Sequence, residues 1–97
     1  MKEHLSLSPD TVIKRSENIA WQKFEDKVFI ITPDDSMLHM LNETGTRIWE
    51  IIEKPKKISE IVEEILKEYD VTKEKAEQSV KRFISELIKK GICEISA

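Results

Sequence analysis

Few side chains of this sequence have the chemistry for catalysis, and none is spaced for it. His4 and His39 lie far apart, and neither has a companion at metal-ligand spacing. Cys93 has no CxxC partner, and its setting GICEI is typical of a small core residue. The acidic pairs Asp34-Asp35 and Glu63-Glu64 fall in an expected turn and on the polar face of an expected helix, whereas acid–base catalysis needs carboxylates that converge in a pocket. The residues therefore predict neither an enzyme nor a cofactor or metal site.

The stretch LNETG, residues 41–45, is a further candidate, because a phosphate-binding loop also joins a strand to a helix. Such a loop is rich in glycine, and this chain has only Gly45 and Gly91. Asn42 is instead a natural N-cap, whose side chain accepts a backbone N–H two or three residues on. Gly45 lowers helix propensity, so we expect it to permit a close approach of another segment. LNETG is therefore predicted to be structural.

The composition is that of a small protein with a slight excess of acidic over basic side chains. The 97 residues carry 16 basic and 19 acidic side chains, and 39% of them are hydrophobic. A net charge of −3 is not the basic field with which nucleic-acid binders displace counterions. No apolar run approaches the length of a membrane span, and a lone cysteine suits a reducing compartment. We therefore expect a single domain over residues 1–97 in the cytoplasm, with neither a membrane nor a nucleic acid as partner.

The first half of the chain is typical of short antiparallel strands that follow a loose N-terminal segment, residues 1–10. Three stretches cluster β-branched and aromatic residues: TVIK, NIAWQKF and KVFIIT. The residues between them suit tight turns, and a turn at Pro33-Asp34-Asp35-Ser36 precedes the strand MLHML. A meander of about three strands cannot close into a barrel, so another element must cover one of its faces.

The second half changes to a helical period. Apolar residues recur every three or four positions in NETGTRIWEIIE, KISEIVEEILKEYD and TKEKAEQSVKRFISELIKKG. Lys54-Pro55 ends the first helix, Thr72 caps the third, and Gly91 separates it from an extended tail, ICEIS. The predicted fold class is α+β: an N-terminal three-stranded antiparallel sheet packed on a three-helix bundle of the winged helix-turn-helix type.

The strand SMLHML, residues 36–41, is unusually apolar for the edge of a sheet. It has no lysine or proline to blunt it, although unpaired N–H and C=O groups at an edge recruit other strands. An open edge beside an apolar helix groove is what a peptide needs in order to add as a further strand. The alternatives are that an adjacent strand, the ICEIS tail or a second copy of the chain covers this edge, the last of which makes a homodimer.

A winged-helix DNA-binding regulator is the alternative function. The third helix region, residues 72–91, holds six basic and three acidic side chains, and Lys81-Arg82 is a pair that a phosphate could use. The helix before it carries four glutamates: Glu60, Glu63, Glu64 and Glu68. A helix that crosses a phosphate backbone should not present such a face, so peptide binding is the favoured interpretation.

Several blocks of the sequence resemble the PqqD family, which comprises pyrroloquinoline-quinone (PQQ) synthesis protein D and its relatives. The blocks are LNETGTRIWEII, ISEIVEEILKEYDVTKEKAEQSV and FISELIKKGICEI, within a resemblance that runs from about residue 9 to 95. Its most specific part is LNETG with Ile48-Trp49, followed at family-like spacing by Tyr69-Asp70 and FxxxLxxxG. The chain departs from the family in two loops, where it has Glu53-Lys54-Pro55 and Lys57.

The resemblance implies a non-catalytic recognition element for ribosomally made, post-translationally modified peptides (RiPPs). Such a module holds the leader of a precursor peptide and presents it to a modifying enzyme, often a radical S-adenosylmethionine (SAM) enzyme, in PQQ biosynthesis or a related pathway. In the family, the leader adds as a strand against the third strand and lies beside the third helix. The residues this implies here are Met37, Leu38, His39, Met40 and Leu41 on the strand, and Lys75, Ser79, Arg82, Phe83 and Glu86 on the helix. The opposite flank of the helix would be Glu77, Lys81 and Ser85.

Overall fold

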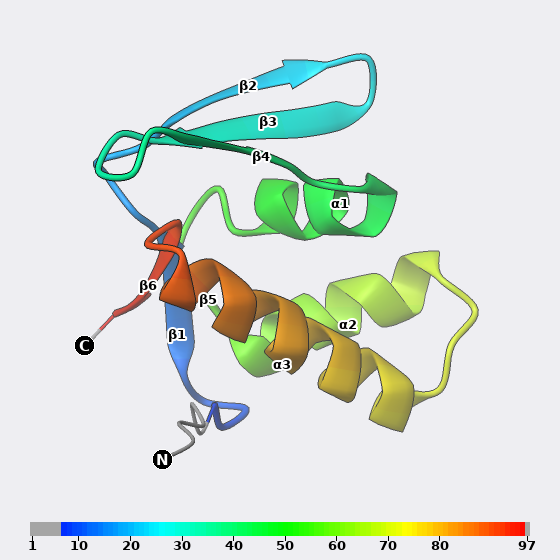
Figure 1. Cartoon of the computed structure of the whole chain (residues 1–97). Helices are drawn as coiled ribbons and strands as arrows, with labels where there is room; N and C mark the ends of the chain where they lie inside the picture. Colours follow the sequence, from blue (N-terminus) through cyan, green and yellow to red (C-terminus); the bar gives the residue numbers. More distant parts are fainter. Residues whose placement is uncertain (1–6, 97) are drawn as a thin grey trace.

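The computed structural model describes residues 7–96, which form two small antiparallel sheets and three helices (Figure 1). The elements in chain order are β1 (Val12–Arg15), β2 (Ala20–Phe24), β3 (Lys27–Thr32), β4 (Met37–Met40), α1 (Glu43–Ile51), β5 (Lys56–Lys57), α2 (Ile58–Glu68), α3 (Lys73–Lys89) and β6 (Cys93–Ser96). One sheet has the order β2–β3–β4 and the other the order β5–β1–β6. The α+β class, the three-stranded sheet and the three helices are thus confirmed. None of the described helices is long and apolar enough to cross a membrane.

The stretch TVIK does not belong to the meander. It lies in β1, where Ile13 pairs with Lys56 of β5 on one side and with Ile95 of β6 on the other. The prediction of a tight turn that pairs TVIK with the next strand is therefore wrong. Residue types identified the strand, but both of its partners come from much later in the chain, and local sequence carries no signal for such pairing.

The loose N-terminal segment was expected over residues 1–10, of which 1–6 lie outside the described residues. Leu7 is buried in the hydrophobic core. The Ser8 N–H donates to the Thr11 hydroxyl at 3.0 Å, and the Thr11 N–H donates to the Ser8 carbonyl at 3.0 Å. The chain is therefore anchored to the fold by Leu7 and by this turn before β1 begins.

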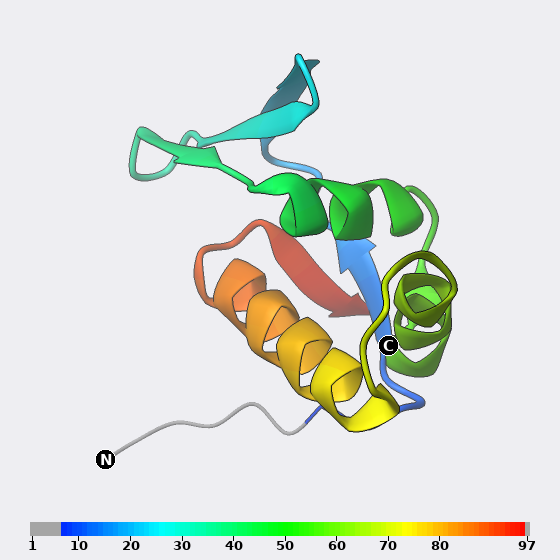
Figure 2. The same cartoon turned by 90° about the vertical axis from the view of Figure 1, so that its right-hand side faces the viewer.

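All three helices lie on one side of the β2–β3–β4 sheet (Figures 1 and 2). Side chains alternate between the faces of a strand, and in β3 Val28 and Ile30 are buried toward α1. From the helix, Ile48 and Trp49 complete this layer of the core, and Trp49 is fully buried. The opposite face of the sheet carries no element among residues 7–96 (Figure 2).

Arg15 joins the two sheets to each other. Its guanidinium lies 4.8 Å from the ring centroid of Trp21 in β2 and 4.4 Å from that of Trp49 in α1. The two indoles themselves meet edge to face at 5.8 Å. The Arg15 guanidinium also donates a hydrogen bond of 2.5 Å from Nη2 to the Trp49 carbonyl oxygen. Cation–π contacts of this kind stabilise by about 0.5–2 kcal/mol, so the stack helps to fix β1 and β2 relative to α1.

The ends of the helices are formed by the residues that the sequence indicated. The Asn42 side chain accepts a hydrogen bond of 2.8 Å from the Gly45 N–H at the start of α1. The Thr72 hydroxyl accepts one of 3.2 Å from the Lys75 N–H at the start of α3. Gly91 follows α3 with φ +76°, a conformation that glycine adopts without steric cost. These predictions are confirmed.

The Thr46 hydroxyl takes the place of one bond in the β3–β4 ladder. The Leu41 N–H donates to the Val28 carbonyl at 2.9 Å, and a paired residue in an antiparallel ladder normally receives a bond in return. Here the second bond of the pair, from the Val28 N–H to the Leu41 carbonyl, is replaced by two bonds through Thr46. The Thr46 hydroxyl accepts from the Val28 N–H at 3.1 Å and donates to the Leu41 carbonyl at 3.3 Å. Thr46 is only 4% exposed and lies in the first turn of α1. Its hydroxyl therefore fastens the end of β4 to the helix.

We predict that Thr46→Val lowers the free energy of unfolding by about 1–3 kcal/mol, because valine has nearly the same shape but leaves a buried N–H and a buried C=O without a partner. Urea denaturation followed by circular dichroism measures the change. Thr44→Val, on the exposed side of the same helix turn, is the matched control and should change stability by less than about 0.5 kcal/mol. Equal stabilities of the two variants would show that the hydroxyl does not hold the strand end.

Cys93 begins β6 inside the core, and burial raises the pKa of its thiol from 9.0 to about 12. A thiol with a raised pKa is neutral at physiological pH, and the thiolate is the reactive form. We predict that alkylation by iodoacetamide at pH 8 is slower in the folded protein than in urea by about 1,000-fold or more, since three pKa units lower the thiolate fraction by that factor. Mass spectrometry of timed samples measures both rates. Labelling of the native protein at the unfolded rate would contradict a buried Cys93.

Candidate functional site: the β4 edge and the groove beside α3

Strand β4 is an outer strand of its sheet, and its far side is unpaired within residues 7–96. The ICEIS tail does not cover it, because β6 pairs with β1 along its whole length. The Leu41 N–H points toward β3, so the alternation of an antiparallel strand directs the backbone groups of Leu38 and Met40 outward. The edge therefore offers free backbone donors and acceptors on a strand with apolar side chains.

A groove of about 320 Å³ lies between β4 and the C-terminal half of α3. Five of the ten residues implied by the resemblance meet in it: His39, Met40 and Leu41 on the strand side, and Phe83 and Glu86 on the helix side. The structure thus brings one strand edge and one helix flank together around a single depression. A strand added to β4 would place alternate side chains over this groove.

The other five implied residues lie outside the groove. Lys75 and Ser79 line a separate cavity of about 220 Å³ near the first turns of α3, together with Tyr69. Their spacing to Phe83 is four residues each time, so this cavity continues the same flank of the helix. Leu38 lines a hollow on the opposite face of the sheet. Two residues are exposed without lining any of these cavities: Met37 and Arg82.

The opposite flank of α3 does not face β4. Glu77, Lys81 and Ser85 are half-buried, and none of them lines the groove or the cavity beyond it. The choice between the two flanks could not be made from helical periodicity, because both border the same buried stripe.

Sequence reasoning missed four residues that line the groove: Asn42, Leu87, Lys90 and Ile92. Lys90 had a signal in the sequence, since it follows Glu86 by four residues on the same flank, and its ammonium lies 4.0 Å from the Glu86 carboxylate. Ile92 had none. It lies beyond Gly91, and only the turn of the chain at that glycine brings it under the groove.

Gly45 sets the distance between α1 and α3 at the end of the groove. A Cβ at this position would lie 2.8 Å from Cζ and 2.9 Å from Cε1 of Phe83, closer than side chains approach one another. The predicted close approach is therefore confirmed. Phe83 is half-buried and packs against the core with one side of its ring while it lines the groove.

The turn before β4 is held by Asp35. Its carboxylate accepts hydrogen bonds from the Thr32 hydroxyl and from the Met37 N–H, the latter at 3.1 Å. The bond from Thr32 is the main reason that the pKa of Asp35 is lowered. The Thr32 hydroxyl also lies 3.3 Å from Nε2 of His39, across the ladder. These contacts fix where β4 begins, as Thr46 fixes where it ends.

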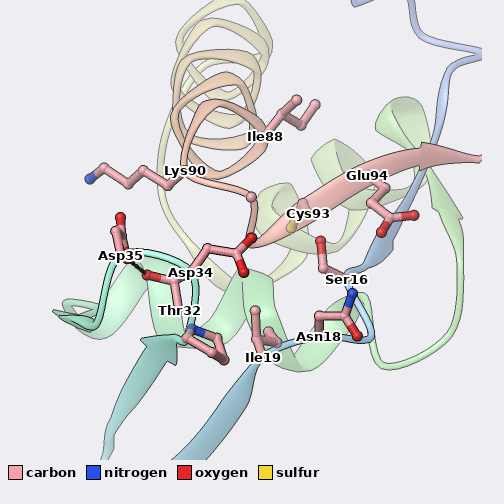
Figure 3. Close-up of a pocket in the computed structure, with 12 residues that line it drawn as sticks. Ser16, Asn18, Ile19, Thr32, Asp34, Asp35, Ile88, Lys90, Cys93 and Glu94 are labelled. Atoms are coloured by element: carbon pink, nitrogen blue, oxygen red, sulfur yellow. Dashed lines mark hydrogen bonds between the residues drawn. The ribbon is translucent and has the colours of Figure 1, made fainter.

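A neighbouring depression of about 510 Å³ is larger than the groove (Figure 3). It lies between the turn that contains Asp34 and Asp35, the loop after β1, and the first residues of β6. Glu94 and Lys90 are its other charged residues. No cluster of three or more His, Cys, Asp or Glu side chains that could hold a metal ion occurs in residues 7–96.

Comparison with known proteins identifies the family. The model of the family "Coenzyme PQQ synthesis protein D (PqqD)" matches residues 27–92, more than half of the chain. Among solved structures, TbiB1 in complex with the TbiA(beta) leader peptide is 28% identical with a TM-score of 0.80, over 87% of this chain and 98% of that one. A comparison with curated proteins gave no match.

Two further structures share the fold at 15% identity. The lasso peptide synthetase B1 complexed with the leader peptide has a TM-score of 0.76, over 84% of this chain and 96% of that one. The PqqD truncation of Methylobacterium extorquens PqqCD, a stand-alone RiPP recognition element solved by NMR, has a TM-score of 0.75, over 92% and 95%. From the family model and the shared fold, this chain belongs to the PqqD family of non-catalytic, peptide-binding proteins.

Proposed function

We propose that this protein captures the leader of a ribosomally made precursor peptide by strand addition to β4 and presents it to a modifying enzyme. The proposed partner enzyme is a radical SAM enzyme or another peptide-modifying enzyme, and the product is PQQ or a related modified peptide. The residues proposed to contact the leader are those implied by the family resemblance, Met37 to Leu41 with Lys75, Ser79, Arg82, Phe83 and Glu86, to which the groove adds Lys90.

The observation that carries this proposal is the open edge of β4 beside the groove. The outward backbone groups of Leu38 and Met40 supply hydrogen bonds for an extended peptide of any sequence, and the groove supplies selectivity for its alternate side chains. A peptide that adds in this way needs no catalytic residue on the protein. The similar TbiB1 structure, which is a complex with a leader peptide, supports leader binding by this chain.

The alternative of a DNA-binding regulator finds no support in the surface of α2. The Glu68 carboxylate accepts a hydrogen bond of 2.7 Å from the Arg47 guanidinium, and Glu60 caps the helix by accepting from the Lys57 N–H at 2.8 Å. Glu63 remains exposed on the same helix. An acidic helix in this position would repel a phosphate backbone.

The proposal is tested by calorimetric titration with the leader half of any short precursor peptide encoded beside this gene, at two salt concentrations. We expect saturable binding that depends little on salt, because backbone hydrogen bonds and apolar contacts are screened less than phosphate contacts. A parallel titration with duplex DNA tests the alternative function, a DNA-binding regulator. Salt-sensitive binding to DNA, with none to the leader, would replace the proposed function by the winged-helix one.

Proline at position 38 or 40 should abolish leader binding while the fold is retained. Leu38→Pro and Met40→Pro remove an outward N–H, and proline is tolerated on an edge strand when its nitrogen faces solvent. Leu38→Ala and Met40→Ala are the controls, because they shorten the same side chains but keep the N–H. Calorimetry should show at least tenfold weaker binding for the proline variants than for their alanine controls. Leader binding that survives both prolines would contradict strand addition at β4.

Phe83→Ala should weaken leader binding by about tenfold, the effect expected when a buried contact worth about 1.4 kcal/mol is lost at an interface. Ile88→Ala is the matched control, since Ile88 is also a half-buried apolar residue of α3 that packs against the core, but it faces the neighbouring hollow. Both variants should lose comparable stability in urea denaturation. If they also weaken binding equally, the groove is not where the leader lies.

A further inference from the structure

The outer face of the β2–β3–β4 sheet is an exposed apolar surface that extends beyond the proposed leader site, with which it shares only Leu38 and Met40 of β4. The registers of the three strands place Phe24, Phe29, Ile31, Leu38 and Met40 on this face. Four of them are widely exposed: Phe24 by 62%, Ile31 by 47%, Leu38 by 63% and Met40 by 58%. Apolar residues gathered on one face in this way mark an interaction surface more often than scattered ones do. We call this surface the outer face.

The outer face is hollowed on both sides of Phe29. One hollow, of about 150 Å³, is bordered by Ile31 and Leu38, and the other, of about 380 Å³, by Phe24 and Met40. The half-buried Phe29 ring stands between them and lines both. Such a surface can receive two apolar side chains of a partner, one in each hollow.

Acidic turns lie at both ends of the outer face. Glu25 and Asp26 form the turn between β2 and β3, and Asp34 and Asp35 lie in the turn between β3 and β4, at the opposite end of the sheet (Figure 1). Lys27 is the basic side chain near the first turn. With β3 six residues long, the two turns are roughly 20 Å apart. A complementary surface therefore has an apolar centre and basic side chains at both ends.

A second copy of this chain does not have that chemistry. Two outer faces stacked about a twofold axis would bring acidic turns against acidic turns, because both ends carry them. The face is also small: three strands of four to six residues span roughly 300 Å², well below the roughly 800 Å² per partner of a stable dimer. Size and charge both favour a transient contact with a different protein.

We infer that the outer face is the docking surface for the peptide-modifying enzyme, which meets it with apolar side chains flanked by basic ones. The inference rests on the proposed function, since it gives the partner of that function a place to bind. The outer face ends at β4, so an enzyme docked there lies next to a leader added at the edge of the same strand. Leader and enzyme thus occupy different sides of one strand and bind at the same time.

The test uses as its probe any peptide-modifying enzyme encoded beside this gene. Biolayer interferometry measures its binding to the wild-type protein and to Phe24→Lys and Ile31→Lys. Both substitutions place a positive charge on the apolar outer face, where it repels the basic side chains expected on the enzyme. Neither Phe24 nor Ile31 belongs to the proposed leader site. We expect each to weaken enzyme binding at least tenfold and to leave leader affinity within twofold. Ile95→Lys, at an exposed apolar residue on the other sheet, is the matched control and should bind the enzyme as the wild type does.

A charge-reversed variant tests the acidic ends. Glu25→Lys combined with Asp34→Lys should slow association several-fold at low salt and remove most of the salt dependence of the association rate, because rim charges act mainly through steering.

Three results would overturn the inference. The first is enzyme affinity unchanged in both Phe24→Lys and Ile31→Lys, and the second is no enzyme binding by a wild-type protein that does bind the leader. The third is a wild-type dimer in sedimentation velocity that Ile31→Lys dissociates, which would make a second copy the occupant. Leader titrations of the same samples separate these results from failure of the proposed function, which would show as loss of leader binding by the wild type itself.

Discussion

The hydroxyl of Thr46 is the contact on which the proposed binding surface depends, because it joins the end of the β3–β4 ladder to helix α1. It bridges the Val28 N–H and the Leu41 carbonyl, which in a regular antiparallel ladder bond to each other. Strand β4 can therefore end at α1 without leaving a buried polar group unpaired. A strand held only by β3 would be free to splay at this end. Because α1 also holds β4, the outward edge of the strand keeps a fixed distance from α3.

The groove is the consequence of that fixed distance. Asn42 caps α1 directly after β4, and the absence of a side chain at Gly45 lets α1 approach the Phe83 ring on α3. One short stretch of chain thereby sets the end of the strand, the start of the helix and the position of the ring at the groove. LNETG is therefore structural, as predicted: it shapes one end of the groove.

The small size of the protein explains why so much of its sheet is open. The three helices lie on one side of the three-stranded sheet, with α1 next to it, and the remaining strands form the separate β5–β1–β6 sheet. A sheet of this kind exposes two surfaces: the edge of β4, which provides backbone groups, and the outer face, which provides apolar side chains. The first suits an extended peptide of variable sequence, and the second suits a folded surface of defined shape. The two surfaces share a strand but not their chemistry.

The sequence by itself determined the three helices, the strands other than β5, the caps and the family, because these depend on local periodicity and on residues close in the chain. Asn42, Thr72 and Gly91 were identified in this way, as was the apolar strand at residues 37–41. Only the tertiary structure decided that TVIK pairs with the ICEIS tail and not with the meander, and which flank of α3 faces the strand. Pairing between distant segments is set by the packing of the whole core around residues such as Trp49, and no local pattern in a chain encodes it.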